Sequence, residues 1–276
     1  MEIVSGSELA TTIRQNLQAE NARDGLRPVL AIIIVGGNEE SLVYVGLKEK
    51  AVQEIGGVCR QVVTPASISK EKLINLITEL NGDERLDGIL LQLPLPEGLQ
   101  SSVEEILSAI KPEKDVDGFN PANRGLLSTG SQYFTSCAAL GCWYVMQHVY
   151  ADLKNKQVLL VGDSFDVIMP LAAILMQAGC RVRMEPEYKS RLLGKADIMV
   201  IEKGRSAMVK GEHLKQKLLL IDAGFHWENG HTLGNVDRES VADKDGWLLP
   251  VPGGLGPLLI AMLMKNLCQA ARQRKQ

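Results

Sequence analysis

The sequence predicts an α/β protein with two α/β domains, the second a Rossmann-like doubly wound parallel sheet, and a cleft between them. Short apolar runs typical of buried strands alternate with segments of helical period, and this alternation favours βαβ units in a parallel sheet. The alternation occurs twice along 276 residues, a length sufficient to bury two cores. We therefore expect two domains rather than one.

The first series of elements predicts a domain at residues 1–137. Its expected strands are "VLAIIIVGG", "VCRQVVTP" and "GILLQLPLP". One helix is expected between the first two strands, from Glu39 to Ile55, and another in "SKEKLINLITEL" before the third. Each strand is thus followed or preceded by a helix that can cover the sheet.

The second series predicts a Rossmann-like domain at residues 138–257. It begins with the strand "VLLVGDS", continues through a helix near 167–178, and adds "CRVRM", "ADIMVIEKG" and "LLLIDAGF". The apolar segment at 258–276, "LLIAMLMKNLCQAARQRKQ", predicts a last helix that returns to the first domain.

Composition excludes several classes of partner. The net charge of −3 creates no field that would attract nucleic acid, and the basic end "RQRKQ" is most simply a solvated helix terminus. The longest apolar runs are shorter than the roughly 18 residues that span a bilayer, so we expect no membrane partner and a cytoplasmic location. The five cysteines form no metal-ligand spacing, and their odd number argues against a disulfide framework.

Polar residues near the expected helix and strand ends of the first domain are candidates for a site. Tyr44 and Lys48 lie four residues apart, so they share one face of the expected helix. That spacing alone is more typical of a surface packing pair. Gln92 follows an apolar strand, where the neighbouring prolines hold it at a sheet edge or form a rigid loop.

Two carboxylates in "KPEKDVDGF" form a third candidate. Asp115 and Asp117 precede Gly118, a pattern that fits a solvated turn or a fragment of a metal site. Two carboxylates without further oxygen ligands are too few for calcium, so we expect no metal.

The order of these motifs is more specific than any one of them. "SLVYVGLKEKAVQEIGG", "LLQLPLP", "KPEKDVDGFNPANRGLL" and "PVPGGLGP" follow one another as in the bifunctional methylenetetrahydrofolate dehydrogenase/cyclohydrolase family, which the chain resembles over almost its whole length. The resemblance implies a homodimer and a folate site. It implies catalytic roles for Lys48, Tyr44 and Gln92, and substrate binding by Tyr44, Gln92, Asp117, Pro252, Gly253 and Gly254.

The chemistry of a folate explains these residue types. A carboxylate such as Asp117 can accept paired N–H groups from the pterin edge, and Tyr44 can stack along the flat part of the ligand. Opening the methenyl bridge requires water to attack a cationic carbon while protons move, which an amine that has lost its hydration can assist as general acid and base. Lys48 is that amine, and Gln92 can orient it.

The second domain departs from the family pattern at the turn that would hold a cofactor phosphate. Where the family has G-R-S-x-x-V-G-x-P, this chain has Gly162, Asp163, Ser164 and, in place of the second glycine, Ile168. A carboxylate and a bulky side chain both oppose an anion at a helix N-terminus. We therefore expect a degraded site and no bound NAD(P).

Other positions depart in the same domain. The family linker P-C-T-P-x-G appears as "SCAALG" at 136–141, Glu202 and Lys203 replace small residues, and Leu249 and Leu259 replace threonines. These changes extend the degraded region beyond the phosphate turn.

Three hypotheses remain open. The favoured one is a tetrahydrofolate-dependent one-carbon enzyme without dehydrogenase activity, which acts as a methenyltetrahydrofolate cyclohydrolase or passes the carbon from a folate donor to a second small-molecule acceptor. The second is an NAD(P)-dependent methylenetetrahydrofolate dehydrogenase/cyclohydrolase with an unusual cofactor site. The third is a non-catalytic folate-binding protein, which would not need Lys48.

Overall fold

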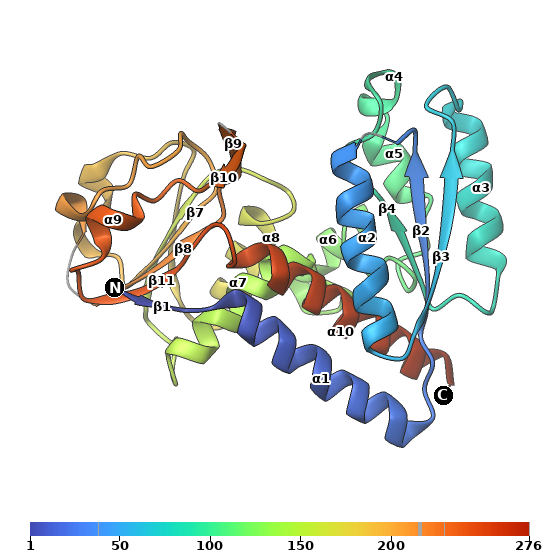
Figure 1. The fold of residues 1–276 in the computed structure, drawn as a ribbon, viewed down its shortest axis with the longest axis horizontal. Helices are drawn as coiled ribbons and strands as arrows, with labels where there is room; N and C mark the ends of the chain where they lie inside the picture. Colours follow the sequence, from blue (N-terminus) through green and yellow to red (C-terminus); the bar gives the residue numbers. More distant parts are fainter. Residues whose placement is uncertain (38, 215–216, 229, 276) are drawn as a thin grey trace. The chain divides into compact units, whose positions relative to one another are not determined.

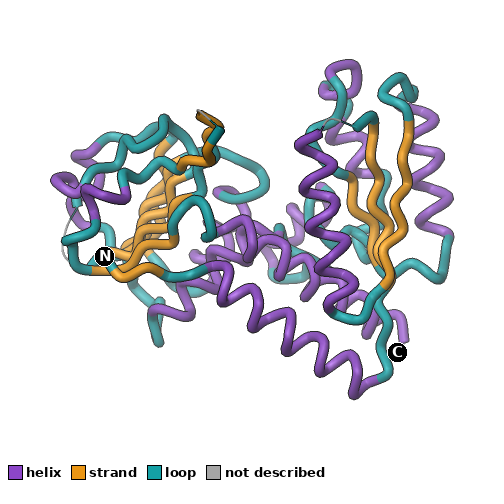
Figure 2. The backbone as a smooth tube through the Cα atoms, in the orientation of Figure 1, coloured by secondary structure: helices purple, strands orange, loops and turns teal. Residues whose placement is uncertain are grey.

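A computed structural model describes residues 1–37, 39–214, 217–228 and 230–275. The chain divides into two compact units, one formed by residues 11–137 with 260–276 and the other by residues 1–10 with 138–259. Both contain a parallel sheet with helices, so the predicted fold class is confirmed (Figures 1 and 2). We name them the three-stranded unit and the six-stranded unit after their main sheets. No helix among the described residues is long and apolar enough to cross a membrane.

The three-stranded unit has the strand order β3-β2-β4, with all pairs parallel. Its elements are β2 (Val29–Val35), α2 (Glu39–Glu54), β3 (Val58–Thr64), α3 (Lys70–Gly82), β4 (Gly88–Leu91), α4 (Glu97–Gln100), α5 (Val103–Ser108), α6 (Pro121–Leu126) and the 3₁₀ turn η1 (Leu127–Thr129). Most of α1 (Gly6–Asp24) and of α10 (Leu255–Lys275) belong to this unit as well.

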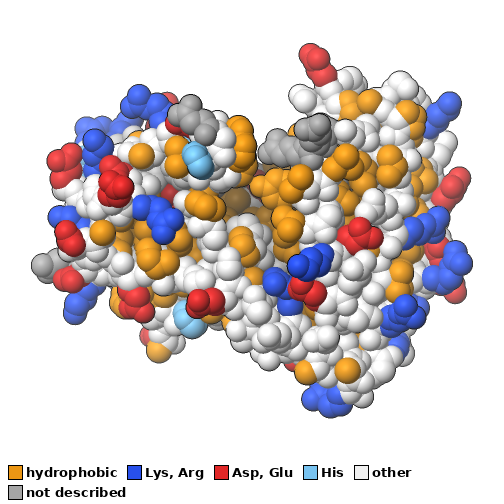
Figure 3. Space-filling model, in the orientation of Figure 1, with side chains coloured by type: hydrophobic (Ala, Val, Ile, Leu, Met, Phe, Trp, Pro, Cys, Tyr) orange, Lys and Arg blue, Asp and Glu red, His pale blue; other side chains and the backbone are white. Residues whose placement is uncertain are grey.

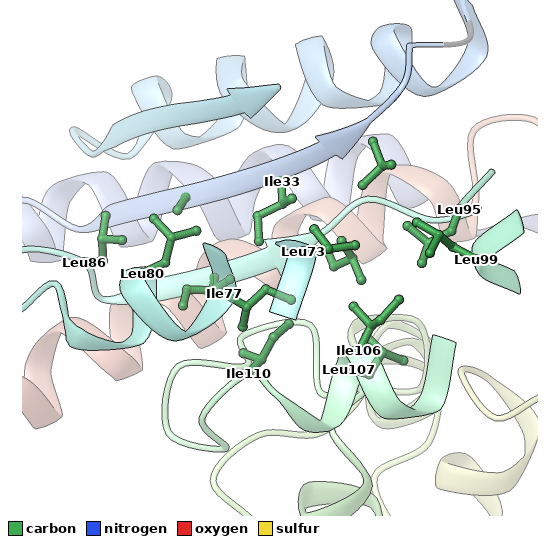
Figure 4. Packing of buried hydrophobic residues seen from close by; sticks show 14 residues of the cluster. Ile33, Leu73, Ile77, Leu80, Leu86, Leu95, Leu99, Ile106, Leu107 and Ile110 are labelled. Carbon is green, nitrogen blue, oxygen red and sulfur yellow. The ribbon is translucent and has the colours of Figure 1, made fainter. Parts of the chain in front are cut away.

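The central strand β2 carries the core of this unit. From Leu30 to Ile34 every residue is buried, which explains why the run is continuously apolar rather than alternating. Ile33 packs in one cluster with Leu73 and Ile77 of α3 (Figure 4). The spacing of Leu73, Ile77 and Leu80 places them on one face of α3. Ser69 caps the first turn of this helix, its hydroxyl accepting the Lys72 N–H.

The six-stranded unit has the order β1-β11-β8-β7-β5-β6, again all parallel. Its strands are β1 (Glu2–Ile3), β5 (Gln157–Val161), β6 (Arg181–Glu185), β7 (Ile198–Ile201), β8 (Leu218–Asp222) and β11 (Gly246–Leu249). A separate antiparallel hairpin joins β9 (His226–Glu228) to β10 (His231–Leu233). The helical elements are α7 (Cys137–Val149), α8 (Ile168–Gln177), η2 (Ser190–Lys195), η3 (Gly211–His213) and α9 (Arg238–Val241).

The N-terminal segment differs from the predicted boundary. Residues 1–10 were expected in the first domain at 1–137, whereas β1 pairs with β11 and places them in the six-stranded unit. A strand of two residues carries too little periodicity to be recognised in a sequence, which is why this pairing was missed.

The basic end of α10 is also more than a solvated terminus. Arg274 Nε lies 2.5 Å from Asp87 Oδ1, and the Asp87 side chain is fully buried. The second oxygen of Asp87 accepts the Val29 N–H at 2.7 Å. Nearer the middle of α10, Asn266 donates to the carbonyls of Val116 and Thr135. These contacts tie residues 260–275 to the three-stranded unit.

We expect Arg274→Met to lower the free energy of unfolding by about 1.5–3 kcal/mol, because Asp87 would keep a buried charge without its charged partner. The matched control is Arg272→Met, whose partner Glu20 is partly exposed, so its loss should be about 0.2–1 kcal/mol. Urea denaturation followed by circular dichroism measures both. Equal losses in the two variants would contradict the assignment.

Candidate active site

The pair formed by Lys48 and Gln92 is the centre of the candidate site. Lys48 lies on α2, and only 7 % of its surface is exposed, which is rare for a lysine. Its Nζ donates to Gln92 Oε1 at 2.9 Å. The Gln92 Nε2 donates to the Leu93 carbonyl at 2.6 Å, so the amide is held with its oxygen toward the lysine.

Gln92 reaches this position because it follows β4 directly. Its backbone N–H still donates to the Ile33 carbonyl of β2, so the residue continues the sheet for one more bond. Its side chain therefore projects from the carboxyl end of a parallel strand, where ligands of α/β proteins bind. The sequence prediction of Gln92 at a sheet edge fits this placement.

The two carboxylates of the loop at 115–118 have different surroundings. Asp115 is buried and accepts the N–H groups of Phe119 and Asn120 and the side-chain amide of Asn123. Burial raises the pKa of Asp115 to about 7, although these hydrogen bonds oppose the shift. Asp115 thus organises the loop.

Asp117 is the second carboxylate of this loop and is itself buried. Gly118, which follows it, has φ +76°, and a Cβ there would lie 2.4 Å from the Thr135 carbonyl carbon and 2.5 Å from the Ser136 nitrogen. Only glycine permits this close approach. The turn "DVDG" is therefore packed against residues 135–136 rather than solvated.

Cys137 is a residue of this site that was not among the candidates predicted from the sequence. Burial and the neighbouring Asp117, which hydrogen-bonds the thiol, raise the pKa of Cys137 well above its usual range, whereas the charge of Lys48 opposes the rise. Its Sγ also lies 3.4 Å from the Val116 carbonyl oxygen. Lys48 and Asp117 thus act on the same thiol, although they come from distant segments. In the sequence, the cysteine of the linker segment "SCAALG" was the signal that could have identified this residue.

Tyr44 lies one helical turn before Lys48 on α2 and is about one-third exposed. Leu42, Val43 and Leu47 are exposed on the same helix, and hydrophobic side chains are visible over α2 in Figure 3. The Tyr44 ring is therefore partly exposed, whereas the Lys48 amine, one turn further along the same side of α2, is buried.

The glycines of "PVPGGLGP" belong to the six-stranded unit. Pro252 follows a cis peptide bond, and Gly253 has φ +88°. A Cβ on Gly254 would lie 2.1 Å from the Pro250 carbonyl oxygen, and the Gly253 carbonyl accepts the Ser7 N–H at 3.1 Å. The motif therefore has a packing role against the N-terminal segment, in addition to the substrate binding that the resemblance implies.

The turn between β5 and α8 is built around a glycine with a positive φ and a serine that caps the helix start. Gly162 has φ +141°, and its N–H donates to the Glu185 carbonyl of β6. Ser164 Oγ accepts the N–H groups of Val167 and Ile168 and so caps the start of the helix. Ile168 is fully buried, so its side chain packs inward at this turn.

The charge of Asp163 is compensated. Its carboxylate lies 2.9 Å from Lys203 Nζ, and both side chains are largely exposed. Asp163 and Lys203, two of the positions that depart from the family pattern, therefore form an ion pair. Among the residues that the structure describes, no group of three His, Cys, Asp or Glu side chains could hold a metal ion.

Comparison with known proteins covers both units. Residues 4–117 match the family model of the tetrahydrofolate dehydrogenase/cyclohydrolase catalytic domain, and residues 136–275 match the model of the NAD(P)-binding domain of the same family. The chain is 51 % identical to bifunctional protein FolD 1 of Syntrophomonas wolfei over the full length of both.

Solved structures agree. The bifunctional FolD methylenetetrahydrofolate dehydrogenase/cyclohydrolase of Campylobacter jejuni is 34 % identical with a TM-score of 0.93, each chain covered to 99 %. The Trypanosoma brucei N5,N10-methylenetetrahydrofolate dehydrogenase-cyclohydrolase, solved with NADP and an inhibitor, is 28 % identical with a TM-score of 0.91, covering 99 % of this chain and 98 % of that one.

These matches correct one expectation. The prediction of a degraded site that binds no NAD(P), drawn from Gly162, Asp163, Ser164 and Ile168, is wrong, because residues 136–275, which include most of this unit, match the NAD(P)-binding family model. The physical reason is the Asp163–Lys203 ion pair, which cannot be recognised in the sequence. It offsets the negative charge of Asp163 that was expected to oppose a phosphate. With both domain models matched in order along one chain, this protein belongs to the tetrahydrofolate dehydrogenase/cyclohydrolase family.

Proposed function

We propose that this protein carries both activities of its family, the oxidation of methylenetetrahydrofolate and the hydrolysis of the methenyl product. The single observation that carries the hydrolytic half is the buried Lys48 amine held by Gln92 close to the Asp117 loop. The match of residues 136–275 to the NAD(P)-binding domain supports the oxidative half. The earlier preference for an enzyme without dehydrogenase activity gives way to this alternative.

The hydrolytic step needs water to add to the methenyl carbon and the bond from that carbon to one folate nitrogen to break. The attacking water loses both of its protons as its oxygen becomes the formyl oxygen: one proton ends on the departing nitrogen and the other is released. Lys48 is the candidate to move these protons, since its amine is buried and donates to Gln92. Gln92 orients the amine, because its own Nε2 is engaged by the Leu93 carbonyl.

Binding of the folate is assigned to Asp117 and Tyr44. A buried carboxylate can accept paired N–H groups of a pterin and fix its orientation. Asp115 holds the loop in which Asp117 lies, and the partly exposed ring of Tyr44 offers a flat surface for stacking. Pro252, Gly253 and Gly254 remain a proposed part of the substrate site.

The residues at the β5–α8 turn fit a nicotinamide dinucleotide in part. The positive φ of Gly162, the capping hydroxyl of Ser164 and the paired charges of Asp163 and Lys203 suit a phosphate at a helix N-terminus. When bound, the cofactor supplies the hydride acceptor. The Glu202 carboxylate beside this turn does not suit an anion.

A homodimer and a cytoplasmic location, both expected from the sequence, stay proposals. The favoured acceptor of the one-carbon unit is water, because Lys48 provides acid–base chemistry and no described residue indicates a second acceptor. Sedimentation velocity of the purified protein tests the dimer.

We expect the purified protein to reduce NADP⁺ or NAD⁺ when methylenetetrahydrofolate is added, and to consume methenyltetrahydrofolate without any dinucleotide. The first reaction is followed by the absorbance of the reduced nicotinamide and the second by the loss of methenyl absorbance. Consumption of the methenyl compound without any nicotinamide reduction would remove the oxidative half of the proposal.

We expect Lys48→Met to lower the rate of methenyltetrahydrofolate hydrolysis by about 10²–10⁴-fold, the usual contribution of a positioned acid–base group. Folate affinity should change much less, and Lys48→Arg should not restore the rate because a guanidinium keeps its proton. The matched control is Lys50→Met, which removes an exposed lysine from the same helix. Equal rates in the Lys48 and Lys50 variants would refute the role of Lys48.

We expect Asp117→Ala to weaken folate binding by about 1.5–3 kcal/mol, the range for a hydrogen bond with a charged partner. Glu113→Ala is the control, since it removes an exposed carboxylate from the preceding segment. Calorimetric titration with a folate measures both variants, and circular dichroism checks that they are folded. Wild-type affinity in a folded Asp117→Ala protein would place the pterin elsewhere.

A further inference from the structure

The turn between β5 and α8 already holds an anion that belongs to the protein. Glu202 directly follows β7, and its N–H donates to the Val161 carbonyl at the end of β5. Because β5 and β7 are parallel neighbours with Val161 opposite Ile201, the Glu202 side chain starts beside Gly162. A residue 40 positions away in sequence thus reaches the phosphate turn.

The carboxylate of Glu202 fills the space that makes Gly162 necessary. Its Oε2 lies 2.7 Å from the position that a Cβ on Gly162 would take. Ser164 hydrogen-bonds the carboxylate through its hydroxyl and its backbone N–H. Oε2 itself is buried and has no hydrogen-bond partner. The Glu202 carboxylate therefore accepts hydrogen bonds from the turn, but one of its two oxygens has no donor.

These donors are the kind that a dinucleotide phosphate uses. Backbone N–H groups and a hydroxyl at the start of a helix form a general anion site, and one carboxylate can occupy it in place of a phosphate. The N-terminus of α8 gains further positive potential from its ten-residue helix. Glu202 is thus an internal ligand of this site.

The surroundings make the charged carboxylate easy to displace. Burial and the like charges of Asp166 and Asp163 raise the pKa of Glu202, whereas the hydrogen bonds from Ser164 lower it. Cys142 of α7 also faces Glu202 but stays neutral, because burial raises its pKa above the usual range. The neighbouring cation Lys203 is engaged by Asp163.

We propose that Glu202 is an internal competitor of the cofactor, whose carboxylate must leave the turn or take up a proton before a nicotinamide dinucleotide can bind. Glu202 thereby sets the cofactor affinity and links cofactor binding to proton uptake. This inference rests on the proposed dehydrogenase activity. It also explains how a family member can keep the cofactor domain while carrying a carboxylate where the family has a small residue.

The direction of the pH dependence follows from charge. A bound phosphate favours the protonated form of Glu202, so the pKa of this residue is higher in the complex than in the free protein. Binding then takes up a proton, and affinity rises as the pH falls toward the pKa of Glu202 in the complex. A glutamine at this position has no charge to lose and removes this part of the dependence.

The test is calorimetric titration of NADP⁺, and separately of NAD⁺, into the full-length wild type, Glu202→Gln and Glu202→Ala at several pH values. We expect both variants to bind at least one dinucleotide about tenfold more tightly or better, because a like charge next to the phosphate is removed. Two buffers of different ionisation enthalpy report the protons taken up, which should fall in Glu202→Gln relative to wild type.

Glu212→Gln is the matched control, because it removes an exposed carboxylate of the same unit by the same change. Thermal unfolding confirms that each variant is folded, and the smaller alanine variant guards against a packing defect in the glutamine one. Equal affinity and equal proton uptake in wild type and both Glu202 variants would overturn the inference while leaving the dehydrogenase intact. Absence of binding in all of them would overturn the dehydrogenase half itself.

Discussion

The burial of strands β2 and β4 constrains where chemistry can occur in the three-stranded unit. From Leu30 to Ile34 and from Gly88 to Leu91 every residue is buried, so neither strand can carry an unpaired polar side chain along its length. Polar groups must therefore project from the strand ends. Gln92 is the first residue after β4, and this position lets one amide complete the sheet with its backbone and face Lys48 with its side chain.

The same constraint separates the two carboxylates of the 115–118 loop. The oxygens of Asp115 accept hydrogen bonds from the loop backbone and from Asn123, as a buried carboxylate requires. Asp117, two residues later, is thereby held beside Cys137. One acidic residue provides rigidity to the loop that carries the other, for which we propose folate binding. Preorganisation of this kind reduces the ordering cost of binding.

In the six-stranded unit, charge is balanced over distances that the sequence does not display. Asp163 and Lys203 are 40 residues apart, yet they pair because β5 and β7 are neighbours and both end at the same edge of the sheet. Glu202 also follows β7, and its carboxylate lies beside Gly162 in the turn. Adjacent residues after β7 therefore act in opposite ways on the cofactor site: Lys203 offsets a negative charge, whereas Glu202 adds one.

The fold class, most of the strands and helices, and the order of motifs that reveals the family could all be predicted from the sequence. These depend on local periodicity, as in the apolar run at 29–35 and the capped helix after Ser69, or on residue types that stand in one contiguous stretch. The sequence also indicated Gln92 at a strand end, since prolines follow it directly. The pairing of β1 with β11 was beyond it, because two residues carry no readable period.

Only the tertiary structure decided which charges compensate one another. The Asp87–Arg274 contact joins residues 187 positions apart, and the thiol of Cys137 feels the charges of both Asp117 and Lys48 only because the 115–118 loop and helix α2 come close to it in the fold. Counting Asp163 as an unpaired negative charge led to the wrong conclusion about the cofactor. Electrostatic energy depends on the distance between charges in space, and sequence separation does not report that distance.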